Sequence, residues 1–322
     1  MTQTYLEAIR AALWEEMERD ERVFLMGEDI GLYGGAFKVT DGFLAHFGTD
    51  RVIDTTISEA GIIGAAVGAA LAGLRPVAEM QFIDFIGCGF NQLTNFAAKC
   101  RYRTGRSVPI VVRGPCGGYV RGGPFHSQNV EAYFLHTAGL KIVYPSTAAD
   151  AKGLLLAAIR DPDPVVFLEP NRIYRLVKQE VADDGKALPL DTCYILREGE
   201  DVTIVTWGSM THETLKAANQ LAEEGISCEV IDLATISPID SETILDSVER
   251  TGRLVIVHEA PRNCGVGAEI AALVAERGLY FLQAPIQRVT GFDTVMPLFR
   301  REMDYIPSVA RVIDGIRAVL KD

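Results

Sequence analysis

The sequence lacks the features that would suit it to nucleic acid, to membranes or to an oxidising compartment. Its 322 residues carry a formal net charge of −12 and contain no basic tract, so we expect no nucleic acid and no membrane surface as a partner. The longest mostly apolar helical run, residues 60–74, is too short to span a bilayer. The six cysteines are scattered without a CxxC pair, and no signal or transit peptide is visible. We therefore predict a cytoplasmic protein with reduced thiols.

The sequence motifs of several common enzyme classes are also missing. No GxGxxG opens a strand–helix unit, because GLYGGAF at residues 31–37 has the wrong spacing. The chain contains no P-loop, no GxSxG elbow and no HExxH. These absences argue against a dinucleotide-dependent dehydrogenase, a nucleotide hydrolase, a serine hydrolase and a metalloprotease.

Short β-branched runs alternate with helical patterns along the chain, which is typical of parallel sheets covered by helices on both faces. The expected strands lie at residues 22–26, 51–55, 76–82, 109–114, 141–145, 164–170, 202–208, 227–233 and 253–260. The expected helices lie at residues 60–73, 87–103, 147–160, 213–225, 240–250 and 265–276. An amphipathic helix is also expected at the N-terminus, where Thr4 and Glu7 have the spacing of a capping box.

A polar, irregular stretch at residues 177–201 interrupts this alternation. We therefore predict an α/β protein with two parallel-sheet domains, residues 1–180 and residues 202–322, joined by a linker at residues 181–201. Both domains are long enough to bury a core of their own.

Chemically useful side chains follow four consecutive strands of the first domain. The loops after these strands carry Glu28, Glu59, Phe85 and His126. Open α/β sheets bind ligands at the carboxyl ends of their parallel strands. We therefore expect these four side chains to form one site at that edge of the sheet.

Each of these residues also has a purely structural interpretation. Glu59 suits the start of a helix, where a carboxylate interacts favourably with the helix dipole. Glu28 and the neighbouring Asp29 suit a solvated loop, and Phe85 suits the core. His126 lies in a glycine-rich loop that is either a binding loop or a flexible surface. The residue pattern alone leaves these alternatives open.

The helix expected after Glu59 is unusually rich in small residues, with glycines at 61, 64, 68 and 73 and alanines between them. Small side chains let another backbone approach closely. This helix is therefore expected either to pack against a second helix or subunit, or to be buried within its own domain.

Six segments together resemble a known family, the beta subunit of the thiamine-diphosphate-dependent decarboxylating component of 2-oxoacid dehydrogenase complexes. They are GEDIG, DTTISEAGIIGAAVGAALAGLRPVAEMQF, RYRTG, HSQNVEAYFLHTAGLKIVYPS, DAKGLLLAAIRDPDPVVFLEP and RVTGFDTVMP. The resemblance extends in order over nearly the whole chain. It implies a thiamine-diphosphate pyrimidine-binding domain followed by a transketolase C-terminal-like domain.

The resemblance also implies a role for each candidate residue. Glu59 matches the glutamate that hydrogen-bonds N1′ of the aminopyrimidine and favours its imino tautomer. Phe85 matches an aromatic residue that packs on the pyrimidine, and Glu28 and Ile57 match residues of the same pocket. His126 matches the histidine that serves acyl transfer to lipoamide. A structural potassium ion is implied at five positions, where Asp163 replaces an asparagine of relatives: Ile110, Ala158, Ile159, Asp161 and Asp163.

One motif of the superfamily is missing from this chain. The GDG motif that holds the diphosphate and magnesium in this superfamily is absent, and in the resembled family it lies on the alpha subunit. The resemblance therefore implies that two alpha and two beta chains assemble, that the alpha subunit holds most of the magnesium site, and that the assembly docks on a dihydrolipoyl acyltransferase core.

The implied activity is decarboxylation of a 2-oxo acid and transfer of the acyl group to lipoyl groups. The segments AEMQFIDF and RYRTG favour a branched-chain 2-oxo acid, with pyruvate or acetoin as alternatives. A non-catalytic assembly subunit is the alternative from another functional class. A self-sufficient transketolase-like enzyme is disfavoured by the missing GDG motif.

Overall fold

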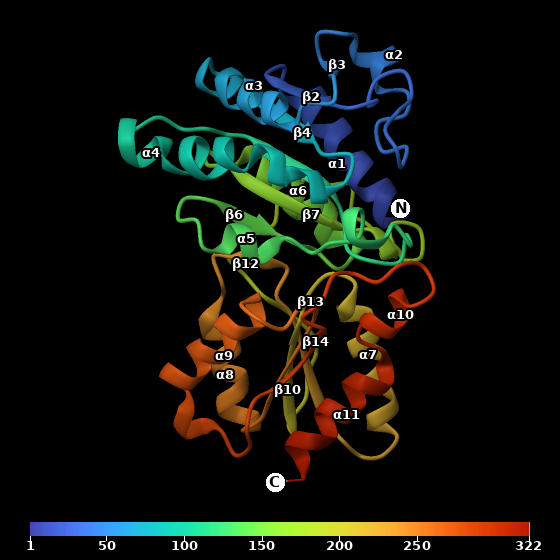
Figure 1. Cartoon of the computed structure of the whole chain (residues 1–322), viewed down its shortest axis with the longest axis vertical. Helices are drawn as coiled ribbons and strands as arrows, with labels where there is room; N and C mark the ends of the chain where they lie inside the picture. The colour runs from blue at the N-terminus through green and yellow to red at the C-terminus, as the bar shows by residue number, and fades with distance from the viewer. Residues whose placement is uncertain (322) are drawn as a thin grey trace.

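Two mostly parallel sheets, one above the other along the long axis, organise the chain (Figure 1). The computed structural model describes residues 1–321. The strands of the first sheet are β2 (Val23–Gly27), β3 (Val52–Asp54), β4 (Arg75–Glu79), β5 (Val111–Cys116), β6 (Lys141–Val143), β7 (Val165–Pro170) and β12 (Thr235–Ser237). They are arranged in the order β12-β6-β7-β5-β4-β2-β3, and all neighbours are parallel except β12 and β6.

The second sheet has five strands and lies in the C-terminal half. Its strands are β9 (Tyr194–Arg197), β10 (Val202–Thr206), β11 (Cys228–Asp232), β13 (Leu254–Pro261) and β14 (Gln287–Gly291). They are arranged in the order β14-β13-β10-β11-β9, with β9 antiparallel. The predicted α/β class with two parallel sheets is confirmed, and each of the nine expected strands is present.

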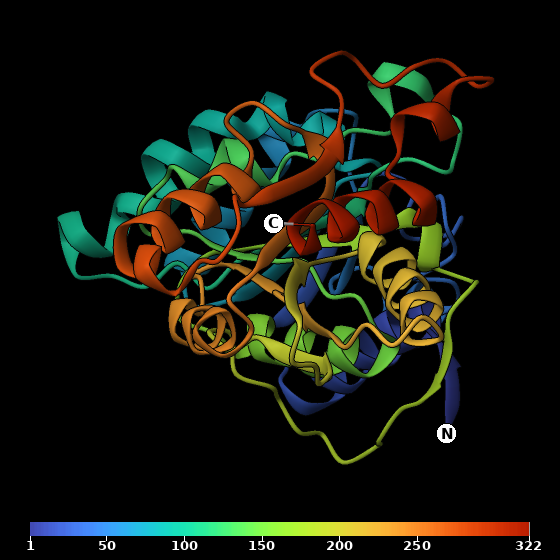
Figure 2. The ribbon, with the colours of Figure 1, turned by 90° about the horizontal axis from the view of Figure 1, so that it is seen from below.

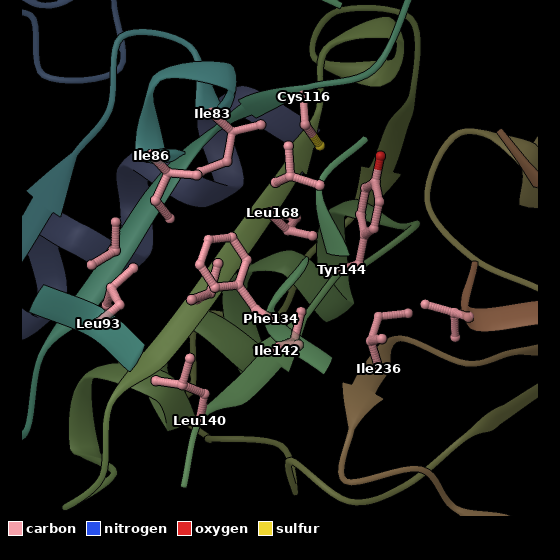
Figure 3. Packing of buried hydrophobic residues seen from close by; sticks show 14 of the residues in the cluster. Ile83, Ile86, Leu93, Cys116, Phe134, Leu140, Ile142, Tyr144, Leu168 and Ile236 are labelled. Carbon is pink, nitrogen blue, oxygen red and sulfur yellow. The ribbon is translucent and has the colours of Figure 1, made fainter. Parts of the chain in front are cut away.

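Helices cover both faces of the first sheet, because its strands are apolar on both sides. One face is covered by α1 (Tyr5–Arg19) and α6 (Ala148–Arg160). The other is covered by α3 (Glu59–Leu71), by the segment containing η1 (Ile83–Gly89), η2 (Gln92–Ala97) and α4 (Ala98–Thr104), and by α5 (Glu131–Leu135). Figure 3 shows part of this second core, including Phe134, Ile142 and Ile236. The predicted capping box is present: Glu7 N donates to Thr4 Oγ1 at 3.2 Å, and Thr4 N donates to Glu7 Oε2 at 2.7 Å.

The second sheet is covered in the same way (Figure 2). Helices α7 (Met210–Ala222) and α11 (Val309–Leu320) pack on one face, and α8 (Ser241–Thr251) and α9 (Val266–Arg277) pack on the other. The short helix α10 (Glu302–Tyr305) precedes α11. Within residues 1–321, no helix combines the length and apolar character needed to cross a bilayer.

The two domains share a sheet, a feature that the sequence pattern does not predict. Strand β12 belongs to the C-terminal half but pairs antiparallel with β6 of the first sheet, and Tyr144 N donates to Ala234 O at 2.7 Å beside it. Residues 181–201, predicted as a linker, contain β9, which pairs with β11 at the edge of the second sheet. The pairing of β12 with β6 holds the second domain against the first.

The helix predicted at residues 87–103 is wrong as a single helix. Residues 83–89 form a 3-10 segment, η1, and residues 90–104 are continuously helical but contain a π segment, η2, before α4. Glycine disfavours a continuous helix, and Gly89 lies where a Cβ atom would come within 2.3 Å of Ile63 Cδ1. The close packing of η1 on α3 therefore requires a glycine at the last residue of the 3-10 segment, just before the helix begins.

A buried ion cluster joins the three central strands β4, β5 and β7. The fully buried Arg113 guanidinium donates to Glu169 Oε1 and Oε2 at 2.5 and 2.6 Å and also to Glu79 Oε2. Tyr174 donates to the same Glu169 carboxylate at 2.5 Å. Burial by itself lowers the pKa of Arg113, but the charges of Glu169 and Glu79 raise it above its usual value. This arginine therefore stays charged in the core.

We predict that Arg113→Met destabilises the chain by about 3–5 kcal/mol, because it leaves two buried carboxylates without a counter-charge. Chemical denaturation followed by circular dichroism measures the change. Arg317→Met is the control, because its ion pair with Glu224 is half-exposed and should contribute less than about 1 kcal/mol. Equal unfolding midpoints for the two variants would contradict this account of the core.

Candidate active site

The four loops that carry the predicted site residues lie at one edge of the first sheet. Their strands β5, β4, β2 and β3 are consecutive neighbours and are all parallel, so their carboxyl ends point the same way. Backbone and side-chain hydrogen bonds connect the loops: Thr55 N donates to Gly27 O at 2.9 Å, and Gly31 N donates to Asp54 Oδ1 at 2.6 Å. The sheet topology therefore brings the loops together.

Glu59 is the first residue of α3 and is half-buried at this edge. The Ser58 side chain makes no capping hydrogen bond, so serine capping does not account for this helix start. Among the residues that the structure describes, none donates a hydrogen bond to the Glu59 carboxylate. The neighbouring Ile57 side chain is 83% exposed. The edge thus presents an acid without a partner beside an uncovered apolar side chain.

Glu28 lies at the end of β2 and is buried, although the solvated-loop interpretation expected it to be exposed. Burial is the main cause of a raised pKa for the Glu28 carboxyl, and the negative charges of Glu59 and Asp29 add to it. The Glu28 carboxyl therefore holds its proton more tightly than an exposed glutamate does.

Phe85 is also placed at the site and not in the core. It lies in η1, which packs against the beginning of α3, and it is half-buried. Its ring centroid lies 5.5 Å from that of His126, and Phe82 lies 4.8 Å from the same imidazole, both in edge-on geometry. Phe37 contacts Phe82 in turn, at 5.6 Å between centroids. The site therefore has an aromatic wall.

The sequence reasoning missed Phe82 and Phe37. Phe82 precedes Phe85 by three residues in QFIDF, a spacing that places both on the same side of a helical turn, so a signal was present. Phe37 comes from the loop after β2 and gave no such signal, because its contact with Phe82 depends on the strand order.

His126 lies in the loop that connects β5 to α5. At the base of the loop Gly117 N donates to Gln128 O at 3.0 Å, and Gln128 N donates to Asp84 Oδ1 at 3.0 Å. Gly117 has a positive φ of 79°, a backbone conformation that favours glycine. The loop is thus a folded structure and not a flexible surface, and it places the imidazole against the aromatic wall.

The five positions implied for potassium lie at the other end of the domain, and three of them already contact cationic side chains. Arg75 donates to the backbone oxygens of Ile159 and Asp161 at 2.6 and 3.2 Å, and Lys141 donates to the Asp161 carboxylate at 2.5 Å. Arg101 donates to Asp163 Oδ1 at 2.5 Å. The Ile110 oxygen accepts from the backbone of β7, and Ala158 is buried in α6. Arg75, Lys141 and Arg101 thus supply positive charge to the oxygens of Ile159, Asp161 and Asp163.

The structure brings Glu28, Ile57, Glu59, Phe85 and His126 to the same edge of the sheet. Two carboxyl groups, an apolar side chain, an aromatic wall and an imidazole form a surface suited to a flat heteroaromatic ring with a protonatable nitrogen. The residues present therefore fit the aminopyrimidine of thiamine diphosphate.

Comparison with known proteins agrees with this geometry. Residues 1–177 match the family described as "Transketolase, pyrimidine binding domain", and residues 191–312 match "Transketolase, C-terminal domain". A solved structure described as "Split gene transketolase, inactive beta4 tetramer" has the same fold, with a TM-score of 0.81 at 24% identity over 99% of this chain and 98% of that chain. The fold and site thus define a protein with the two domains of a transketolase-type enzyme.

Curated relatives narrow this class. The chain is 49% identical to the 2-oxoisovalerate dehydrogenase subunit beta of Bacillus subtilis, over 99% of this chain and 98% of the relative. It is 48% identical, with the same coverage, to the pyruvate dehydrogenase E1 component subunit beta of Acholeplasma laidlawii. The chain belongs to the family of 2-oxoacid dehydrogenase beta subunits, as the resemblance in the sequence predicted.

We predict that Glu28→Gln becomes more stable relative to the wild type as the pH rises. The pKa of Glu28 is higher in the folded state than in the unfolded state, so the unfolded state ionises first as the pH rises. The stability of the wild type therefore falls as the pH rises from the unfolded-state pKa through the folded-state pKa. Glutamine does not ionise. Thermal unfolding at about pH 4.5 and about pH 7.5 measures the difference between the two proteins. Glu249→Gln, at an exposed position of α8, is the control, and an unchanged difference across this range would contradict the prediction.

Proposed function

We propose that this chain forms half of the active site of a 2-oxoacid dehydrogenase, binds the aminopyrimidine of thiamine diphosphate and transfers acyl groups to a lipoyl group. The observation that carries the proposal is the convergence of Glu28, Glu59, Phe85 and His126 at one sheet edge in a chain of this family. The chain's own fold supplies each of these side chains from a different strand end.

The residues of this chain have distinct roles in the proposal. The Glu59 carboxylate, which has no partner among the described residues, accepts a hydrogen bond from a ring nitrogen and stabilises its protonated form. Phe85 and Ile57 pack on the ring and exclude water from it. His126 gives and takes a proton near the reacting carbon during acyl transfer. When bound, thiamine diphosphate supplies the electron sink that permits loss of CO2 from a 2-oxo acid.

The second half of the site comes from an alpha subunit in this proposal. The small-residue face of α3, at Gly61, Ala65 and Gly68, is exposed, while its other face is buried in the domain. Together with the exposed Ile57, this face supports close packing by another chain. We propose an assembly of two alpha and two beta subunits, with magnesium held mainly by the alpha subunit, that docks on a dihydrolipoyl acyltransferase core.

A branched-chain 2-oxo acid is the proposed substrate, supported by the segments AEMQFIDF and RYRTG and by the relative named for 2-oxoisovalerate. Pyruvate is the alternative, because a relative named for pyruvate is similar to almost the same degree, and acetoin is the second alternative. 2-Oxoisovalerate differs from pyruvate by two methyl groups, each of which changes transition-state binding by only about 1–3 kcal/mol, whereas acetoin carries a hydroxyethyl group in place of the carboxylate.

The potassium ion also remains a proposal. The oxygens of Ile159 and Asp161 converge on the single guanidinium of Arg75, so they lie close enough to share one cation. A potassium ion at this position would replace that guanidinium on the same oxygens.

The proposal predicts that Glu59→Ala, in enzyme reconstituted with its alpha subunit, lowers thiamine-diphosphate-dependent decarboxylation about 100-fold or more, because it removes the acceptor for the ring nitrogen. Rates with 2-oxoisovalerate, pyruvate and acetoin identify the substrate. Glu249→Ala is the control. If the alpha subunit adds no thiamine diphosphate binding to the wild type, the chain is a non-catalytic assembly subunit.

For His126→Ala we predict a loss of about 100-fold in reductive acylation of a lipoyl domain, with a much smaller change in the affinity for thiamine diphosphate. The reason is that, in the proposal, Glu59, Phe85 and Ile57 hold the pyrimidine, while His126 acts on the acyl group. Acylation is followed by mass spectrometry of the lipoyl domain, and cofactor affinity by tryptophan fluorescence. Weakened cofactor binding with normal acylation would refute this role.

A further inference from the structure

A buried carboxylate of the second domain reaches into the loop that carries His126. Glu259 lies near the carboxyl end of β13 and its residue is only 5% exposed. It belongs to a different domain from every residue of the proposed site. It makes no ion pair within residues 1–321, so its charge is balanced by hydrogen-bond donors and not by a cation.

Three donors converge on the Glu259 carboxylate. Gly118 N donates to Oε1 at 2.5 Å, and Asn129 Nδ2 donates to the same oxygen at 3.0 Å. Ser209 Oγ donates to Oε2 at 2.9 Å and thereby fixes the orientation of the carboxylate. Hydrogen bonds to an ionised acceptor are about twice as strong as those between neutral groups. One side chain therefore ties together the two ends of the loop, at Gly118 and at Asn129.

A residue of the first domain also holds the base of this loop. Asp84 accepts from Gln128 N, and Gly117 N donates to Gln128 O. Glu259 thus holds the base of the loop from one domain, while Asp84 holds it from the other. Asn129 is fixed further because its Oδ1 accepts from Tyr144 Oη at 2.7 Å.

The position of the His126 imidazole depends on these hydrogen bonds, because the residue lies within the loop that they hold. His126 is three residues before Asn129, and Gly117 just before the loop and Gly123 within it have positive φ angles. Glycine-rich backbone of this kind has many accessible conformations when its ends are free. Fixing both ends limits where the imidazole can lie, and a displacement of about 1 Å at a reacting group is enough to slow catalysis markedly.

We propose that Glu259 is a positioning residue that holds the His126 loop in place by accepting hydrogen bonds from both of its ends. The second domain thereby contributes to acyl transfer without touching the site. The inference rests on the proposed function for its catalytic consequence, whereas the holding of the loop is independent of that function.

Amide hydrogen exchange of the full chain tests the holding of the loop directly. Glu259→Ala removes all three hydrogen bonds, so amides between residues 117 and 129 should exchange about tenfold faster or more. Glu259→Gln keeps an acceptor oxygen for Gly118 and Asn129 and gives Ser209 an N–H donor, so its exchange should stay within about threefold of the wild type. Glu229→Ala is the matched control, because Glu229 is an equally buried acid that pairs with Arg250 near the opposite end of the second sheet. Unchanged exchange in Glu259→Ala would overturn the proposal.

The reconstituted enzyme tests the link to His126. Glu259→Ala should slow lipoyl acylation about tenfold or more, Glu259→Gln should restore it to within about threefold, and Glu259→Ala should cause no further loss when combined with His126→Ala. A glutamine variant as slow as the alanine variant, or additive losses in the double variant, would overturn the positioning role. If wild-type enzyme shows no thiamine-dependent turnover, the proposed function fails, and the exchange measurement still decides whether Glu259 holds the loop.

Discussion

The parallel alignment of four neighbouring strands is the constraint on which the site depends. β5, β4, β2 and β3 end at one edge, and each end is followed by a loop of different chemistry. No two of these loops are adjacent in the sequence, so only the hydrogen-bonded sheet brings their side chains together. Two of these strands, β4 and β5, are also joined to β7 by the buried Arg113, whose partner Glu79 is the last residue of β4. A charged group in the core thus ties together strands that carry Phe85 and His126.

The two domains of the chain contribute unequally to the site but depend on each other. The first domain supplies all the candidate side chains, and the second supplies an edge strand, β12, and hydrogen-bond acceptors for the loop of His126. Glu302 of α10 accepts from Tyr119 N in the same loop, so a second buried acid of that domain faces it. A loop whose backbone donors are satisfied by a separate domain can be ordered only when the two domains are correctly packed. Domain packing is therefore part of the geometry of the site.

Local pattern was sufficient to predict the parts of this fold that depend on local physics. The capping box of Thr4 and Glu7, the alternation of strands and helices and the strand-end loops are all set by near neighbours in the sequence. The pairing of β12 with β6 and the contact of Phe37 with Phe82 join residues far apart in the chain, and no periodicity indicates them. The same holds for Glu259. In the sequence, Glu259 is one of many carboxylates near the end of an apolar strand. Only the fold shows that the glycine-rich loop lies against it.

The edge of the sheet is built at a cost to the stability of the isolated chain. A half-buried Glu59 with no hydrogen-bond donor among residues 1–321, and a buried Glu28 beside it, are unfavourable next to an exposed Ile57. Departures of this kind from the usual rules of folding concentrate at functional sites, where a ligand or partner later supplies the missing contacts. The exposed small-residue face of α3 begins at the same glutamate, so the surface proposed for the alpha subunit and the acid proposed for the ring nitrogen are continuous. The partner chain would cover this surface, and the cofactor would bind this acid. Binding of either should therefore favour binding of the other.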